Sequence, residues 1–238
     1  MTIARKIETI LSRSSWIRKM FEEGGRLKAQ HGAQNVFDFS LGNPNIAAPE
    51  CFDKALAETA CSCSGEHGYM PNTGYPHVRQ AVARHVSEEQ AVTVDENDIV
   101  MTCGASGALN VALKTLLDPG DEVLTPIPCF VEYGFYADNH GGVLKTVPTH
   151  PDFSLDLEGF EQAITDRTKV VLINSPNNPT GQIYSRESLD ALGDLLGIIG
   201  AVIEAVRLAI AIGVGIGRAA VAQAGFGLVG VGGTVVIK

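Results

Sequence analysis

The segment Lys169–Gly181 (KVVLINSPNNPTG) is the part of the chain from which the fold can be read most directly. Its start, Lys169–Ile173, is almost wholly apolar and short, which is typical of a strand buried on both faces of a parallel sheet. The residues that follow form a polar stretch bracketed by Pro176 and Pro179. Loops that follow such strands line the edge at which open α/β sheets bind ligands. The segment therefore predicts a buried strand that carries a rigid polar loop. A structural Asn-Pro turn is the alternative interpretation.

Short apolar stretches alternate with helical patterns on both sides of this segment. Further strands are expected at Val36–Leu41, Ile99–Thr102, Glu122–Thr125 and Val143–Val147. Helices are expected to begin at Ser14 or Ser15, at Pro76 and at Ser185, and to occupy Glu50–Thr59, Ala105–Leu117, Phe130–Ala137 and Leu157–Ile164. This alternation predicts the α/β class, a mostly parallel sheet with helices on both faces, preceded by an N-terminal helical arm.

The composition changes near Leu196. The stretch from Gly197 to Lys238 consists of apolar residues and glycine, with these exceptions: Glu204, Arg207, Arg218, Gln223, Thr234 and Lys238. Such a sudden loss of polar residue types indicates a frameshifted or fused reading frame. The alternative is a natural tail that packs as a surrogate helix, over 198–206, and as strands, over 210–216.

Charge and cysteine content exclude several classes of protein. A formal net charge of −9 argues against broad binding to nucleic acid or to anionic membranes. An odd number of cysteines, 5 in 238 residues, fits reduced thiols and a cytoplasmic location. The first residues lack the continuous apolar core of a signal peptide. The uncharged stretch Ala219–Ile237 is long enough to span a membrane, but its glycines argue against that role.

A metal site is not expected. Cys61, Cys63 and His67 are close in sequence, but no fourth ligand follows at a spacing that suits zinc. We therefore interpret these cysteines as free thiols.

The step from Ile99 to Leu109 (IVMTCGASGAL) is a candidate anion site. Gly104 allows a tight turn, and a helix then begins with Ala105 and Ser106. The free N–H groups and the positive dipole end of a helix start favour phosphate, and the Ser106 hydroxyl can add a hydrogen bond. A plain strand-to-helix turn with serine as a cap is the alternative.

These two segments occur together with four further motifs, namely Phe39–Pro44 (FSLGNP), Tyr69–Gly74 (YMPNTG), Pro119–Val123 (PGDEV) and Pro126–Phe130 (PIPCF). From about Ser15 to Leu196 the chain closely resembles the class I/II aminotransferases of the fold-type I pyridoxal-phosphate group. The resemblance implies an arm or small-domain segment at 1–45 and a partial large domain at 46–196, followed by an atypical tail at 197–238.

The resemblance also implies a site for pyridoxal 5'-phosphate. Gly104, Ala105 and Ser106 match the helix start that binds the cofactor's phosphate. Phe130 matches the aromatic residue that stacks on the pyridine ring, for which core packing is the alternative role. Asn178 matches the amide that bonds the cofactor's phenolic oxygen.

Two more residues are assigned by the same resemblance. Tyr69 resembles the tyrosine that reaches across a dimer interface to the neighbour's cofactor phosphate, which implies a homodimer. Gly42 resembles the glycine whose backbone lies beside the substrate carboxylate. The substrates implied for full-length relatives are an amino acid and a 2-oxo acid.

No catalytic residue is assigned. The family requires a Schiff-base lysine, an acid at the pyridine nitrogen and an arginine for the substrate carboxylate, all beyond Gly181. Beyond Lys169 the remaining lysine is Lys238, and Arg207 and Arg218 lie in apolar surroundings. We therefore expect an aminotransferase-family protein that is truncated and not competent alone. The alternatives are a non-catalytic cofactor- or phosphate-binding fragment and another fold-type I enzyme, such as a lyase or decarboxylase.

Overall fold

The computed structural model describes residues 3–39, 46–62, 68–90, 93–199, 228–231 and 234–237. The chain forms two compact units, Met1–Gly68 and Tyr69–Lys238. The expected division at residues 45 and 196 stays a prediction. The expected strands over 210–216 and most of the expected helix over 198–206 lie outside the described residues.

The first unit consists of helices. It contains α1 (Arg5–His31), a short 3-10 helix (Ala33–Asn35) and α2 (Glu50–Ser62). Helix α1 ends at Gly32, whose φ of 84° is in the region that favours glycine. The Lys28 ammonium then pairs with the Asp38 carboxylate at 2.7 Å, which holds the segment after the 3-10 helix against α1.

Two expectations for this unit are wrong. The N-terminal helix does not begin at Ser14 or Ser15 but at Arg5, because the residues before the serines contain no glycine or proline that would end a helix. No strand forms over residues 36–39, the described part of Val36–Leu41. Phe37 and Phe39 are 83% and 92% exposed, so the alternating pattern has no covering layer in the described part of the chain.

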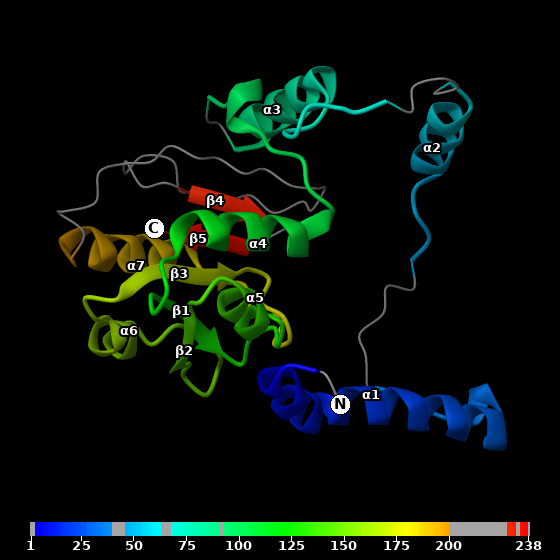
Figure 1. Ribbon diagram of the computed structural model, residues 1–238, viewed down its shortest axis with the longest axis horizontal. Coiled ribbons are helices and arrows are strands. Elements are labelled where there is room, and N and C mark those ends of the chain that lie inside the picture. Colours follow the sequence, from blue (N-terminus) through cyan, green and yellow to red (C-terminus); the bar gives the residue numbers. More distant parts are fainter. Residues whose placement is uncertain are drawn as a thin grey trace. The chain divides into compact units, whose positions relative to one another are not determined.

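The second unit is an α/β layer structure (Figure 1). Its elements, in chain order, are α3 (Pro76–Gln90), a 3-10 helix (Glu96–Asp98), α4 (Gly104–Leu116), β1 (Glu122–Ile127), α5 (Tyr133–Asn139), β2 (Val143–Pro148), α6 (Leu157–Ala163), β3 (Thr168–Asn174), α7 (Arg186–Ile199), β4 (Leu228–Val231) and β5 (Thr234–Ile237). The expected helices between Pro76 and Leu196 and the expected strands Glu122–Thr125, Val143–Val147 and Lys169–Ile173 are therefore confirmed. The Ser185 cap is confirmed too, since its hydroxyl accepts the Ser188 N–H at 3.2 Å.

The sheet has the strand order β2-β1-β3-β5-β4. Strand β1 pairs in parallel with β2 and with β3, as a strand-helix-strand alternation predicts. The two C-terminal strands are antiparallel: β5 pairs with β3 and with β4. Figure 1 shows β4 and β5, in red, extending the sheet beyond β3.

Helices cover both faces of the sheet, because alternate residues of each strand point to opposite sides. Val123, Val170 and Leu172 pack with α4 and α5 in one buried cluster. Leu124 of β1, together with Val171 and Ile173 of β3, packs with Phe160 of α6 and with α7 in a second cluster. The predicted α/β class is confirmed, since β1, β2 and β3 form a parallel sheet with helices on both faces, to which β4 and β5 add antiparallel pairs.

The expected strand Ile99–Thr102 is not part of the sheet in the described structure. Ile99 is fully buried and its backbone is extended, but the Met101 N–H donates to the Thr73 carbonyl at 2.9 Å. The apolar run is thus paired with the turn before α3.

Among the described residues, no helix combines the length and apolar character needed to cross a bilayer.

A polar cluster ties together the amino ends of the three parallel strands. The Glu122 carboxylate of β1 accepts hydrogen bonds from Lys145 of β2 at 2.7 Å and from Thr165 at 2.7 Å, and Thr168 of β3 lies 3.4 Å away. The hydrogen bond from Lys145, followed by that from Thr165, lowers the pKa of Glu122, against an opposing effect of burial. Because the charged form is favoured in the folded state, this stability is present above the ordinary glutamate pKa of about 4.3 and is lost as the pH falls below it.

We expect Glu122→Gln to lower the free energy of unfolding at pH 7 by about 1–3 kcal/mol, the range for hydrogen bonds to a charged group. Urea unfolding between pH 3 and 8 measures the effect, and the difference from the unmodified chain should shrink below about pH 4. Glu161→Gln, on the exposed surface of α6, is the control. A loss that is independent of pH would contradict this role of the Glu122 charge.

Candidate functional site

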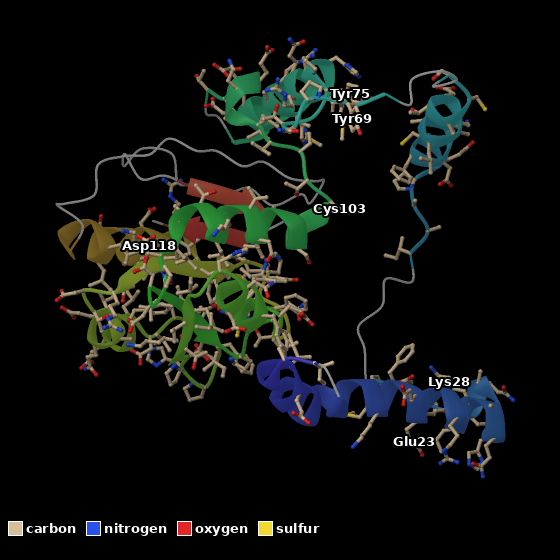
Figure 2. The ribbon with its side chains drawn as sticks, viewed as in Figure 1. Glu23, Lys28, Tyr69, Tyr75, Cys103 and Asp118 are labelled. Carbon is tan, nitrogen blue, oxygen red and sulfur yellow. The ribbon has the colours of Figure 1, made fainter. Side chains whose placement is uncertain are left out.

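The start of α4 has the features of an anion site. Gly104 has a φ of 69°, and its N–H donates to the Thr102 carbonyl at 3.0 Å, which turns the chain into the helix. Gly104, Ala105 and Ser106 are exposed. The first N–H groups of a helix have no acceptor within the helix, and the dipole adds positive potential there. Figure 2 marks this point with Cys103, the residue that precedes the helix.

A buried tyrosine orients the serine at this helix start. The Ser106 hydroxyl lies 2.7 Å from the hydroxyl of Tyr136, which belongs to α5 and is 8% exposed. The pair joins α4 to α5. Sequence reasoning did not identify Tyr136 as a site residue, because its helical spacing indicates burial but not a partner 30 residues away.

Phe130 follows β1 on the way to α5. Its ring meets the Tyr133 ring edge-on, with 5.6 Å between centroids and 79° between planes. It is partly buried against the cluster formed by α4 and α5. The packing role considered for Phe130 is therefore present, and the residue as a whole stays partly exposed.

The loop after β3 presents one asparagine and buries its neighbour. Asn177 is 4% exposed, and its side-chain amide donates to the Pro128 carbonyl at 3.0 Å and to the Thr180 hydroxyl at 2.9 Å. Asn178 is exposed, and its backbone N–H donates to the Asn174 side chain at 2.9 Å. Asn177 thus fastens the β3 loop to the β1 loop and leaves the amide of Asn178 accessible.

Hydrogen bonds and ring packing therefore connect three of the predicted positions. Ser106 contacts α5, Phe130 packs on α5, and the loop that carries Asn178 is bound to the segment before Phe130. Sequence reasoning missed Asn177, although its place beside Asn178 in a proline-bracketed loop was the available signal.

The other two predicted positions are not part of this connected set. The Tyr69 side chain is fully exposed in the segment before α3 (Figure 2), so it makes no extensive contact within the described chain. Gly42 lies outside the described residues.

Lysines in the described part of the second unit lie away from these loops. Lys114 is in the last turn of α4, and Lys169 is at the amino end of β3. Lys145 is held by Glu122 at the amino ends of the strands. The described residues therefore offer backbone N–H, hydroxyl, ring and amide groups at the site, but no amine for covalent bonding.

The candidate metal ligands do not form a site in the described structure. Cys61 is exposed, and Cys63 and His67 lie outside the described residues. Across the described ranges, no three histidine, cysteine, aspartate or glutamate side chains gather in a way that could hold a metal ion.

Comparison with known proteins gives a consistent result. Residues 34–197 match the family described as aminotransferase class I and II. A probable aspartate aminotransferase from Methanocaldococcus jannaschii is 35% identical over 165 residues, which cover 68% of this chain and 42% of that protein. The aspartate/prephenate aminotransferase of Thermus thermophilus is 37% identical over 171 residues, 71% of this chain and 44% of that protein.

A solved aminotransferase from Eubacterium rectale has the same fold. Its crystal structure matches with a TM-score of 0.79 at 33% identity, covering 89% of this chain and 54% of that one. This chain spans less than half the length of the two curated relatives named above.

Two buried tyrosines should respond in opposite ways to loss of the hydroxyl. The Tyr184 hydroxyl is buried without a hydrogen-bond partner in the described structure, and burial raises its pKa to about 12. We expect Tyr184→Phe to raise the free energy of unfolding by about 1 kcal/mol and Tyr136→Phe, which loses Ser106, to lower it by about as much. Urea unfolding measures both, and changes of the same sign would contradict the assignment of partners.

Substitutions of the adjacent residues Asn177 and Asn178 should differ in their effect on stability. Asn177→Ala should lower the free energy of unfolding by about 1–3 kcal/mol, because the Pro128 carbonyl and the Thr180 hydroxyl lose the buried amide that donates to them. Asn178→Ala changes an exposed side chain and should shift it by less than about 0.5 kcal/mol. Chemical denaturation of both variants checks this, and equal losses would show that the β3 loop does not depend on Asn177.

Proposed function

Because the chain belongs to the class I and II aminotransferases, whose members depend on pyridoxal phosphate, we propose that its second unit binds the phosphate and ring of that cofactor. The observation that carries the proposal is the start of α4. There an exposed helix N-terminus carries the Ser106 hydroxyl, which is held by Tyr136. A phosphate dianion suits this donor set, because helix N–H groups and a hydroxyl donate without bringing a competing negative charge.

Two other groups fit the remainder of the cofactor. The accessible part of the Phe130 ring offers a stacking surface, and the exposed amide of Asn178 can donate to an oxygen on the ring. Asn177 keeps the two loops together, so the ring contact and the amide contact keep a set spacing. When bound, the cofactor supplies an electron sink for chemistry at an amino-acid substrate.

We propose transfer of an amino group between an amino acid and a 2-oxo acid as the reaction that this architecture serves. The two curated relatives named above carry aspartate and prephenate in their names, which makes aspartate the first donor to test. Gly42, beside the substrate carboxylate, and Tyr69, at the cofactor of a neighbouring subunit, belong to the same proposal. It includes a homodimer in the cytoplasm.

The described residues support binding more strongly than turnover. The lysines of the second unit that can be placed are in the last turn of α4 or at the amino ends of the strands. We therefore propose that this chain holds pyridoxal phosphate non-covalently and does not transfer amino groups by itself. This non-catalytic role is the second candidate beside amino-group transfer, and the positions of these lysines favour it.

Titration of the purified chain with pyridoxal phosphate, followed by ligand absorbance and protein fluorescence, tests the binding. Ser106→Ala should weaken binding roughly tenfold, since a hydrogen bond to a charged phosphate contributes about 1.5 kcal/mol or more. Thr115→Ala, at the far end of the same helix, is the matched control and should bind unchanged. Inorganic phosphate should compete with the cofactor for the unmodified chain.

Catalysis is tested on the same samples. Borohydride treatment followed by mass spectrometry should leave the protein mass unchanged, because the described lysines of the second unit lie away from the site. Aspartate with 2-oxoglutarate should give no product above the blank. A cofactor-sized mass increase or steady turnover would overturn the non-catalytic part of the proposal, and equal affinities of the Ser106 and Thr115 variants would overturn the phosphate site.

A further inference from the structure

The edge of β3 that faces away from β1 is occupied by residues near the end of the chain. Strand β5 pairs with it in an antiparallel register from Val171 opposite Ile237 to Asn174 opposite Thr234. Strand β4 then pairs with the outer side of β5. The occupant is a short strand, Thr234–Ile237, of sequence TVVI, rich in the β-branched residues that favour strands.

The ladder with β5 extends along β3 beyond the point at which the ladder with β1 ends. The β1 ladder reaches Leu124 opposite Val171 and pairs no residue beyond that point. Further along, the Thr125 hydroxyl donates to the Leu172 carbonyl at 2.9 Å, so the backbone of Leu172 faces β1. Backbone groups of successive strand residues point to alternate sides, which directs Val171 and Ile173 toward β5.

The β3 backbone requires such a partner. With β5 in place, Val170, Val171, Leu172 and Ile173 are each 0–2% exposed, so the paired edge is withdrawn from water. An unpaired buried backbone group costs free energy comparable to a lost hydrogen bond, and a bare strand edge is a template for pairing with another chain. The observed partner is one apolar strand in antiparallel orientation.

We propose that this edge of β3 is a strand-binding site, which the chain fills with its own Thr234–Ile237 and which the same strand of a second copy enters when the first is displaced. Strand addition of this kind takes its affinity from main-chain hydrogen bonds and its selectivity from alternate side chains. The proposal does not depend on cofactor binding.

Amide hydrogen exchange on the full-length chain tests the site. Val235 lies opposite Ile173, so Val235→Pro removes an N–H that faces β3, whereas Val235→Thr keeps the N–H and the β-branched shape. The amides of Val171 and Ile173 should exchange about tenfold or more faster in the proline variant, and at nearly the unmodified rate in the threonine variant. Equal exchange in all three proteins would overturn the pairing.

A synthetic peptide of residues 228–238 tests entry by a second copy. It should bind the Val235→Pro protein and restore slow exchange at Val171 and Ile173, and it should bind the unmodified chain at least tenfold more weakly, because the edge is already filled. The same peptide with Val235→Pro is the control. Failure of the unmodified peptide to protect these two amides in a folded proline variant would overturn the claim of binding by a second copy.

A cross-link keeps the pairing testable if the proline variant does not fold. Residues directly opposite on antiparallel strands have the spacing of a disulfide, so Asn174→Cys with Thr234→Cys should link under mild oxidation. Asn174→Cys with Leu228→Cys is the control and should not link. Peptide mapping by mass spectrometry identifies the bond, and absence of the 174–234 link would overturn the pairing.

Discussion

Complete burial of the β3 backbone is the constraint on which the second unit depends. Four successive residues, Val170 to Ile173, are withdrawn from water on both faces of the sheet. Alternate side chains go to opposite clusters, so helices must lie on both sides. Each backbone group must also find a protein partner, which β1 supplies at the amino end and β5 at the carboxyl end.

The candidate site is a product of this burial. A rigid central strand sets the position at which its loop begins, and buried Asn177 then binds that loop to the one after β1. Ser106 reaches the same neighbourhood through Tyr136 of α5. Buried Asn177 and Tyr136 thus hold the segments that carry exposed Asn178 and Ser106. A preorganised ligand site requires this kind of support.

Local pattern predicted most elements of the second unit, because strands buried on both faces have a distinct composition. Ile99–Thr102 has that composition as well, yet its partner is the Thr73 turn, and only the tertiary structure decides this. Val36–Leu41 alternates like a strand, but Phe37 and Phe39 stay exposed in the described part of the chain. Motifs located Ser106, Phe130 and Asn178, whereas Tyr136 and Asn177 act through partners remote in sequence. The pairing of Thr234–Ile237 with β3 could not be predicted from the sequence either, because nothing in the two segments specifies which strand each pairs with.

The Thr125 hydroxyl donates to the Leu172 carbonyl just beyond the point at which the backbone ladder between β1 and β3 ends. From there on, two side chains, Thr125 and Asn177, connect the diverging strands and loops in place of a continuous backbone ladder. Each of these two links depends on one polar side chain, so a single substitution can remove it without changing the backbone ladder of the sheet. The spacing between the loop that carries Phe130 and the loop that carries Asn178 is therefore set by individual side chains rather than by the sheet beneath them.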